Sequence, residues 1–112
     1  MPKRNITQGT APAQIENLGR ELGARIATAR KRRRWRAVDL AARAGITRET
    51  LRRVEAGALG TGLGPYLAAL WALGLAEDVR LLAAAERDAS GRILADARLG
   101  ERVRGEAVDD DF

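Results

Sequence analysis

The twenty residues AVDLAARAGITRETLRRVEA (37–56) decide the expected fold of this chain. Ala37 to Ala44 predicts a short helix that ends before Gly45, because the residue just past a helix often needs a positive φ. Thr47 is a good N-cap for a further helix, from Arg48 to about Glu55. The stretch therefore predicts a helix-turn-helix, in which two short helices pack across a tight turn.

The side chains of this stretch divide into an inner and an outer set. A helix-turn-helix needs a small residue where its helices touch, and Ala41 is placed to be that residue. The apolar residues that we expect behind the turn are Leu40, Ile46, Leu51 and Val54. The charged residues of the second helix lie opposite these anchors on a helical wheel, and they are Arg48, Glu49, Arg52 and Arg53. One side of this helix is thus predicted to join the core and the other to be exposed.

The exposed side has the chemistry to read DNA bases. Arginine can donate two hydrogen bonds to guanine O6 and N7, and glutamate can accept one from cytosine N4. The candidate DNA-contacting residues are therefore Thr47, Arg48, Glu49, Arg52 and Arg53. An alternative is that these charges form solvated ion pairs three or four residues apart on an ordinary helix. The charges alone favour that alternative, but the glycine, the small residue and the anchors beside them favour a DNA-reading helix.

Composition narrows the class of protein. A chain of 112 residues has room for one domain, and its leucine and alanine outnumber β-branched residues, which favours helices. It has no cysteine and no histidine, so a zinc site and the usual nucleophile–base pairs of enzymes cannot be built. We therefore expect no enzymatic activity and no cofactor. No apolar run approaches the roughly 18 residues of a membrane span and no signal peptide is visible, so we expect a cytoplasmic, nucleoid-associated protein.

Charge is concentrated in one half of the chain. Residues 1–57 hold 14 Lys/Arg against 5 Asp/Glu, whereas residues 58–112 hold 6 against 10, which gives the whole chain its net charge of +5. A basic first half favours binding to a polyanion, and an acidic second half suits a protein partner. The alternative is that arginine only keeps an alanine-rich helical protein soluble.

The sequence before the central stretch predicts an arm and a helix. Residues 1–14 contain two prolines and a glycine among polar residues, which is typical of a flexible arm. A first helix is expected from Ile15 to about Arg33. Its apolar face, spaced by three and four residues, consists of Ile15, Leu18, Leu22, Ile26 and Ala29.

The sequence after the central stretch predicts two more helices and an extension. After several glycines, Pro65 fits the first turn of a fourth helix, and Ala76 to about Ala85 is expected to form a fifth. These elements complete a domain at residues 15–86. Residues 87–112 are predicted to be a partly ordered extension with one or two helical turns.

The stretch from Leu22 to Gly57, including DLAARAGITRETLRRVEAG (39–57), resembles the XRE (Cro/phage-repressor-like) helix-turn-helix family. The resemblance spans about residues 16–84 and implies an all-α, five-helix lambda-repressor-like domain. In that family the start of the third helix contacts bases, a role that carries over to the five candidate residues named above. The family also pairs an arginine late in the first helix with a glutamate that ends the third, which implies a structural ion pair between Arg30 and Glu55.

The second helix departs from the family pattern at its start. Many members begin it with Thr or Asn followed by a Gln that touches a phosphate, whereas this chain has Arg36 and Ala37 and a weak N-cap. The phosphate contact is then lost or passes to Arg36, and Arg43 is a further candidate DNA contact. Six of the seven residues 30–36 are basic, which suits DNA phosphates and also the dipole at the end of the first helix.

Later residues resemble HipB-type antitoxins, the XRE proteins that accompany HipA-type kinase toxins. The matching positions are Leu63-Gly64, Tyr66, Leu70, Trp71, Leu73-Gly74-Leu75, Asp78, Leu82-Ala83, Gly91, Leu94 and Asp96 to Leu99. This resemblance implies a homodimer that binds a palindromic operator in double-stranded DNA, represses its own operon and neutralises a HipA-like kinase toxin. The alternatives are a stand-alone transcriptional regulator without a toxin, and a helical interaction module that binds no DNA.

Two aromatic residues of the expected fourth helix bear on its partners. Tyr66 and Trp71 are five residues apart, so they cannot both face the same line of core residues. Either one of them lies at an interface, or Trp71 packs over the end of the first helix. Aromatic residues are common in both settings, so the sequence leaves the two open.

Overall fold

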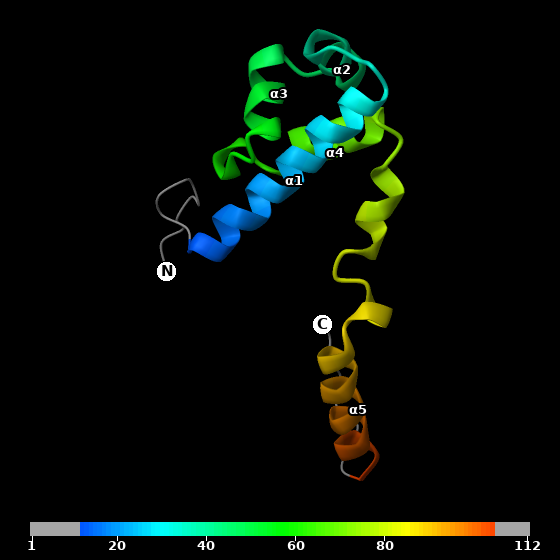
Figure 1. The fold of residues 1–112 in the computed structure, drawn as a ribbon. Coiled ribbons are helices and arrows are strands. Elements are labelled where there is room, and N and C mark those ends of the chain that lie inside the picture. The colour runs from blue at the N-terminus through cyan, green and yellow to red at the C-terminus, as the bar shows by residue number, and fades with distance from the viewer. Residues whose placement is uncertain (1–11, 105–112) are drawn as a thin grey trace. The chain divides into compact units, whose positions relative to one another are not determined.

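The computed structural model describes residues 12–104, and every regular element within them is a helix (Figure 1). The all-α expectation is confirmed for this part of the chain. The chain divides between Ala76 and Glu77 into two compact units, whereas the expected domain extends to residue 86. The predicted arm before Pro12 and the acidic end of the predicted extension lie outside the described residues.

The first unit is built from four α-helices and a short 3-10 helix within the described residues. They are α1 (Ala13–Arg32), α2 (Ala37–Ala44), α3 (Arg48–Glu55), the 3-10 helix η1 (Leu59–Thr61) and α4 (Leu63–Ala72). Helices α2 and α3 have the predicted bounds, and α1 begins two residues before the expected Ile15. Helices α2, α3 and α4 pack against one another, and α3 packs against α1 (Figure 1).

The core of the first unit lies where these helices meet. Its large, fully buried side chains are Ile26, Leu40, Leu51 and Val54. Ala41 is buried with them and Ile46 packs against them, so the predicted anchors of α2 and α3 are confirmed. The predicted apolar face of α1 is wrong at its beginning. Ile15 and Leu18 are exposed, because the first turns of α1 extend past the other helices (Figure 1).

The turn between α2 and α3 has the backbone geometry that the sequence predicts. Gly45 has a φ of 73°, and its N–H and that of Ile46 donate to the carbonyls of Ala42 and Ala41 at 3.2 and 3.0 Å. These two bonds satisfy carbonyl groups that the end of α2 would otherwise leave unpaired. Thr47 Oγ1 accepts a hydrogen bond from the Thr50 N–H at 3.0 Å and so caps the start of α3.

Helix α1 approaches the end of α3 at Gly23. A Cβ atom on Gly23 would lie 2.5 Å from the Val54 carbonyl oxygen and 2.7 Å from that of Glu55. Gly57, which follows α3, is similarly close to the backbone of Gly19. Only glycine therefore lets the two backbones come this near, and the contact fixes where α3 lies on α1.

The remaining elements differ from the prediction. The expected α-helix from Ala76 to Ala85 is wrong: the chain forms a 3-10 helix η2 (Ala76–Leu81) without a buried residue. It is followed by η3 (Ala85–Arg87) and by α5 (Ala89–Arg104), which is longer than the one or two turns expected there. None of the apolar side chains in η2 is buried, and 3-10 helices are short elements that commonly serve as connectors.

Candidate nucleic-acid interface

Helix α3 presents its charged side chains on the side away from the core. Leu51 and Val54 are fully buried, which turns Arg48, Arg52 and Arg53 to the surface, where all three are exposed. Thr47 and Glu49 are exposed as well. All five candidate base-contacting residues therefore lie on the surface, at the start and along the outer side of one short helix.

Glu49 is at the centre of an ion-pair cluster on this surface. Its Oε2 accepts from Arg52 Nη2 at 2.6 Å and from Arg53 Nε at 3.2 Å, and its Oε1 accepts from Arg52 Nε at 3.0 Å. The hydrogen bond from Arg52 is the main cause that lowers the pKa of Glu49 to about 2. Glu49 is thus a carboxylate at physiological pH, and it holds both guanidinium groups at the surface.

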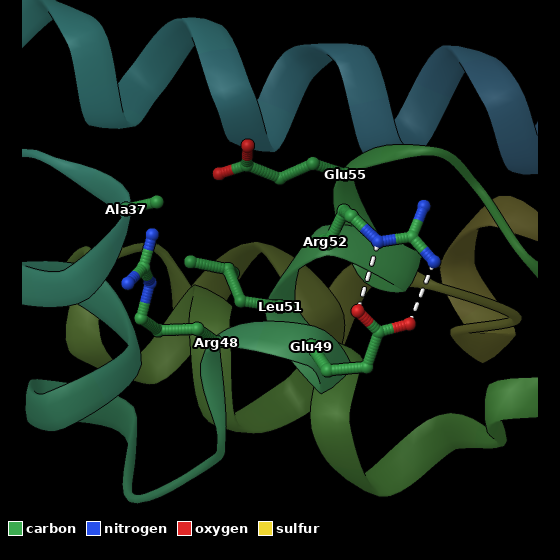
Figure 2. Close-up of a pocket in the computed structure, with 6 residues that line it drawn as sticks. All are labelled: Ala37, Arg48, Glu49, Leu51, Arg52 and Glu55. Atoms are coloured by element: carbon green, nitrogen blue, oxygen red, sulfur yellow. Dashed lines mark hydrogen bonds and ion pairs between the residues drawn. The ribbon is translucent and has the colours of Figure 1, made fainter.

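A groove of about 430 Å³ lies between the start of α2 and α3. Its lining consists of Ala37, Arg48, Glu49, Leu51, Arg52 and Glu55. Figure 2 shows Arg48 beside Ala37 and, on the other side of Leu51, Glu49 bonded to Arg52. Arg48 makes no ion pair or side-chain hydrogen bond within residues 12–104, so its five N–H donors are available to a ligand. Ala37 contributes only a small side chain to the lining of this groove.

Arg30 and Glu55 form a bidentate ion pair between α1 and the end of α3. Arg30 Nε donates to Oε2 of Glu55 at 2.7 Å and Nη2 donates to Oε1 at 3.0 Å, while Nη1 donates to the Trp35 carbonyl at 3.0 Å. The side chains are only 13% and 16% exposed. The hydrogen bond to Glu55 raises the pKa of Arg30. The pair ties α3 to α1 and, through Trp35, to the segment before α2.

No family model, no curated protein and no solved structure matches this chain. Among the described residues, no group of three or more acidic side chains is arranged to hold a metal ion. None of the helices between residues 12 and 104 combines the length and the apolar character that a membrane crossing requires.

The other two candidate DNA contacts have partners inside the molecule. Arg36 Nε lies 3.3 Å from Asp39 Oδ2, and the guanidinium carbon of Arg43 lies 4.0 Å from the centre of the Trp35 ring. The stacking of Arg43 is a cation–π contact. Within the described residues, no hydrogen bond or ion pair joins Arg36 or Arg43 to the Glu49 cluster. The structure therefore joins Glu49, Arg52 and Arg53 in one cluster, whereas Arg36 contacts Asp39 and Arg43 contacts Trp35.

Sequence reasoning missed three residues that position this site. Asp39 Oδ2 accepts the Arg36 N–H at 2.8 Å, so the start of α2 is satisfied by its third residue rather than by an N-cap side chain. Gly23 permits the close approach of α1 to α3. Arg33 donates to the carbonyls of Ala29 and Leu73 at 2.8 and 2.9 Å and so joins the ends of α1 and α4. The spacing of Arg36 and Asp39 was a readable signal, whereas the other two contacts depend on the tertiary structure.

Arg34 is in the left-handed region, with a φ of 59°. Its N–H and that of Trp35 donate to the carbonyls of Lys31 and Arg30 at 2.9 and 3.3 Å, which is the helix ending that usually contains glycine. A non-glycine residue in this conformation costs about 1–2 kcal/mol. An exposed arginine thus occupies a position whose backbone conformation favours glycine.

Arg34→Gly is expected to raise the free energy of unfolding by up to about 1 kcal/mol, because glycine removes the left-handed strain but adds entropy to the unfolded chain. Urea denaturation followed by circular dichroism measures this change. Arg34→Lys keeps both the charge and the Cβ atom, so it should leave stability unchanged. A loss of stability in Arg34→Gly would contradict this account of the helix end.

Proposed function

We propose that this chain is a sequence-specific DNA-binding repressor, with a lambda-repressor-like helix-turn-helix formed by α2 and α3. Helix α3 enters the major groove, which is wide enough for one α-helix. The observation that carries the proposal is the exposed side of α3. It presents Arg48, Glu49, Arg52 and Arg53 together while its other side is fully buried.

Rigidity of α3 supports this proposal. The Arg30–Glu55 pair and the backbone contact at Gly23 hold the end of α3 against α1, and the Thr47 cap and Gly45 fix its start. A helix that reads bases must present its side chains in one orientation, because each bidentate contact depends on geometry. A solvated helix that binds nothing does not depend on a fixed orientation, so these four restraints favour the DNA-binding alternative.

Glu49 has two roles in this proposal. In the free protein it accepts hydrogen bonds from Arg52 and Arg53, which holds both guanidinium groups beside each other on the same surface. On DNA its carboxylate can accept from cytosine N4, and the two arginines can turn to guanine. The same contacts also fit the alternative of solvated ion pairs, so only a DNA-binding experiment separates the two.

For the biological setting, we propose the antitoxin of a HipBA-like toxin–antitoxin pair. The support is the resemblance of residues 63–99 to HipB-type antitoxins and the acidic second half of the chain, which suits a protein partner. In this setting a homodimer binds a palindromic operator, represses its own operon and neutralises a HipA-like kinase toxin. Co-purification with the product of the neighbouring gene distinguishes it from a stand-alone regulator, which has no such partner.

A gel shift with the DNA upstream of the gene tests the function. Binding should favour this duplex over a scrambled one of equal length and should weaken steeply with salt, since log K falls by about 0.9 for each phosphate neutralised per unit of log salt. Binding that ignores both sequence and salt would contradict the proposed reading of bases by α3, and the absence of any shift would support the helical interaction module that binds no DNA.

Arg53→Ala should weaken binding to the specific duplex by about 1–3 kcal/mol and relax the preference at one base pair, if Arg53 makes a bidentate contact with guanine. Gel shifts on single-base variants of the duplex measure both effects. Arg25→Ala is the matched control, because Arg25 is an exposed arginine of α1 whose contact with Glu21 is 3.7 Å long. An unchanged base preference in Arg53→Ala would mean that Arg53 does not contact a base.

A further inference from the structure

The outer side of α4 carries a line of exposed apolar side chains. Leu63, Leu67 and Trp71 follow each other at four-residue spacing and are 68%, 36% and 67% exposed. Residues four apart lie on one side of a helix, so these three side chains form one stripe. We call Leu63, Leu67 and Trp71 the α4 stripe.

The inner side of α4 and Leu73, the residue that follows the helix, belong to the core. Ala69 and Leu73 are buried, and Tyr66 is buried with its hydroxyl donating to the Ala58 carbonyl at 2.8 Å. Burial raises the pKa of Tyr66, which keeps this hydroxyl protonated as a donor. Of the two aromatic residues, Tyr66 therefore belongs to the core, and Trp71 does not pack over the end of α1. An exposed tryptophan at the end of an apolar line is typical of an interface.

The stripe lies in a part of the sequence without charge. Residues 56–76 contain no Lys, Arg, Asp or Glu, whereas residues 1–57 hold 14 basic residues against 5 acidic ones. Two copies of this chain that met through the basic helices would bring like charges together, which is unfavourable. Two copies that meet through the α4 stripe avoid this repulsion, and a two-fold contact places the same patch on both sides.

The size of the stripe limits the strength of such a contact. Large side chains bury about 150–250 Å² each, so the exposed parts of the three give roughly 350 Å² per copy and roughly 700 Å² for a pair. Stable interfaces bury about 1,200–2,000 Å². The contact alone is therefore expected to be weak in solution, and to be strengthened when two copies are held on neighbouring DNA half-sites.

We propose that the α4 stripe is the surface through which two copies of this chain associate, and that this association makes the binding of two DNA half-sites cooperative. The second part rests on the proposed DNA-binding function. The first part concerns the protein alone and stands without it.

The test is sedimentation equilibrium of the full chain over a wide concentration range, without DNA. The wild type should show a monomer–dimer equilibrium. Trp71→Glu removes the largest side chain of the stripe and places an unpaired carboxylate in an apolar contact, so it should weaken the association at least ~100-fold. Leu18→Glu is the matched control, because Leu18 is a 57% exposed residue of α1, and it should associate as the wild type does. Thermal unfolding checks that both variants keep the fold.

Fluorescence separates the possible occupants of the stripe. Trp35→Phe leaves Trp71 as the remaining tryptophan, and its emission should move to shorter wavelength as the protein concentration rises. Emission at short wavelength from a monomer would mean that the chain covers the stripe itself, and this would overturn the proposal. A wild type that stays monomeric, or a dimer that survives Trp71→Glu, would overturn it too. A wild type that forms the dimer but binds no specific duplex would instead contradict the proposed function. It would leave the association through the α4 stripe intact.

Discussion

Glu55→Ala is expected to lower the free energy of unfolding by about 3 kcal/mol, at the lower end of the roughly 3–5 kcal/mol lost when a buried ion pair loses one partner. The reason is that Arg30 would remain between α1 and α3 without the carboxylate that now accepts two of its hydrogen bonds. The lower end applies because both side chains keep some contact with solvent, at 13% and 16% exposure. Urea denaturation of the two proteins, followed by circular dichroism, measures the difference.

Glu77→Ala is the control for this prediction. Glu77 accepts a hydrogen bond from Arg80 at the same 2.7 Å, but these side chains are 79% and 77% exposed. Exposed pairs contribute little to stability, so this variant should change the free energy of unfolding by less than about 0.5 kcal/mol. Equal losses in the two variants would mean that the Arg30–Glu55 pair is an ordinary surface pair. The pair would then have no special role in holding α3 against α1.

Gly23→Ala is expected to destabilise the fold by about 1–3 kcal/mol, because the new methyl group would overlap with backbone atoms that have no rotamer to change. The nearest of these is the Val54 carbonyl oxygen, 2.5 Å from the position of the Cβ atom. The loss would occur although alanine is the better helix former by about 1 kcal/mol. The same displacement of α3 should also weaken binding to a specific duplex.

Gly64→Ala gives the matched comparison within the first unit. Gly64 is also helical, but a Cβ atom there would meet nothing within 4 Å. This variant should leave stability unchanged or raise it by up to about 1 kcal/mol. Thermal unfolding of both variants therefore separates the effect of close packing from that of helix propensity. A Gly23→Ala protein as stable as Gly64→Ala would contradict the described approach of α1 to α3.

The bounds of α2 and α3 could be predicted because local chemistry determines them. Gly45 takes the positive φ that ends α2, and Thr47 caps α3 through its own hydroxyl. The buried side of α3 followed from the spacing of Leu51 and Val54 in the same way. Such features depend only on residues that are close together in the sequence, so the sequence alone predicts them.

Features that depend on residues far apart in the sequence could not be predicted from the spacing of the apolar residues. Ile15 and Leu18 have helical spacing, but the helices that would cover them end too early (Figure 1). The apolar residues after Ala76 suggested an α-helix, yet none of those in η2 is buried. Periodicity indicates which side of a helix is apolar, and it does not say whether another element covers that side.

The candidate site shows the same difference between local features and features that depend on distant residues. The exposed side of α3 could be read from a helical wheel, whereas the stacking of Arg43 on Trp35 joins residues from separate elements. The resemblance to the XRE family pointed to Arg30 and Glu55, and the structure places them 2.7 Å apart. Their link to Trp35 and the approach at Gly23 needed the three-dimensional fold.

Selection of bound sequences from a random duplex library tests most directly whether the exposed side of α3 reads DNA. The wild type should enrich one two-fold symmetric sequence, with half-sites about one helical turn, roughly 34–36 Å, or a multiple of it apart. The Arg52→Ala/Arg53→Ala variant should lose the preference at the corresponding positions of both half-sites while keeping its fold by circular dichroism. No enriched sequence for the wild type, or the same sequence enriched by both proteins, would contradict the account.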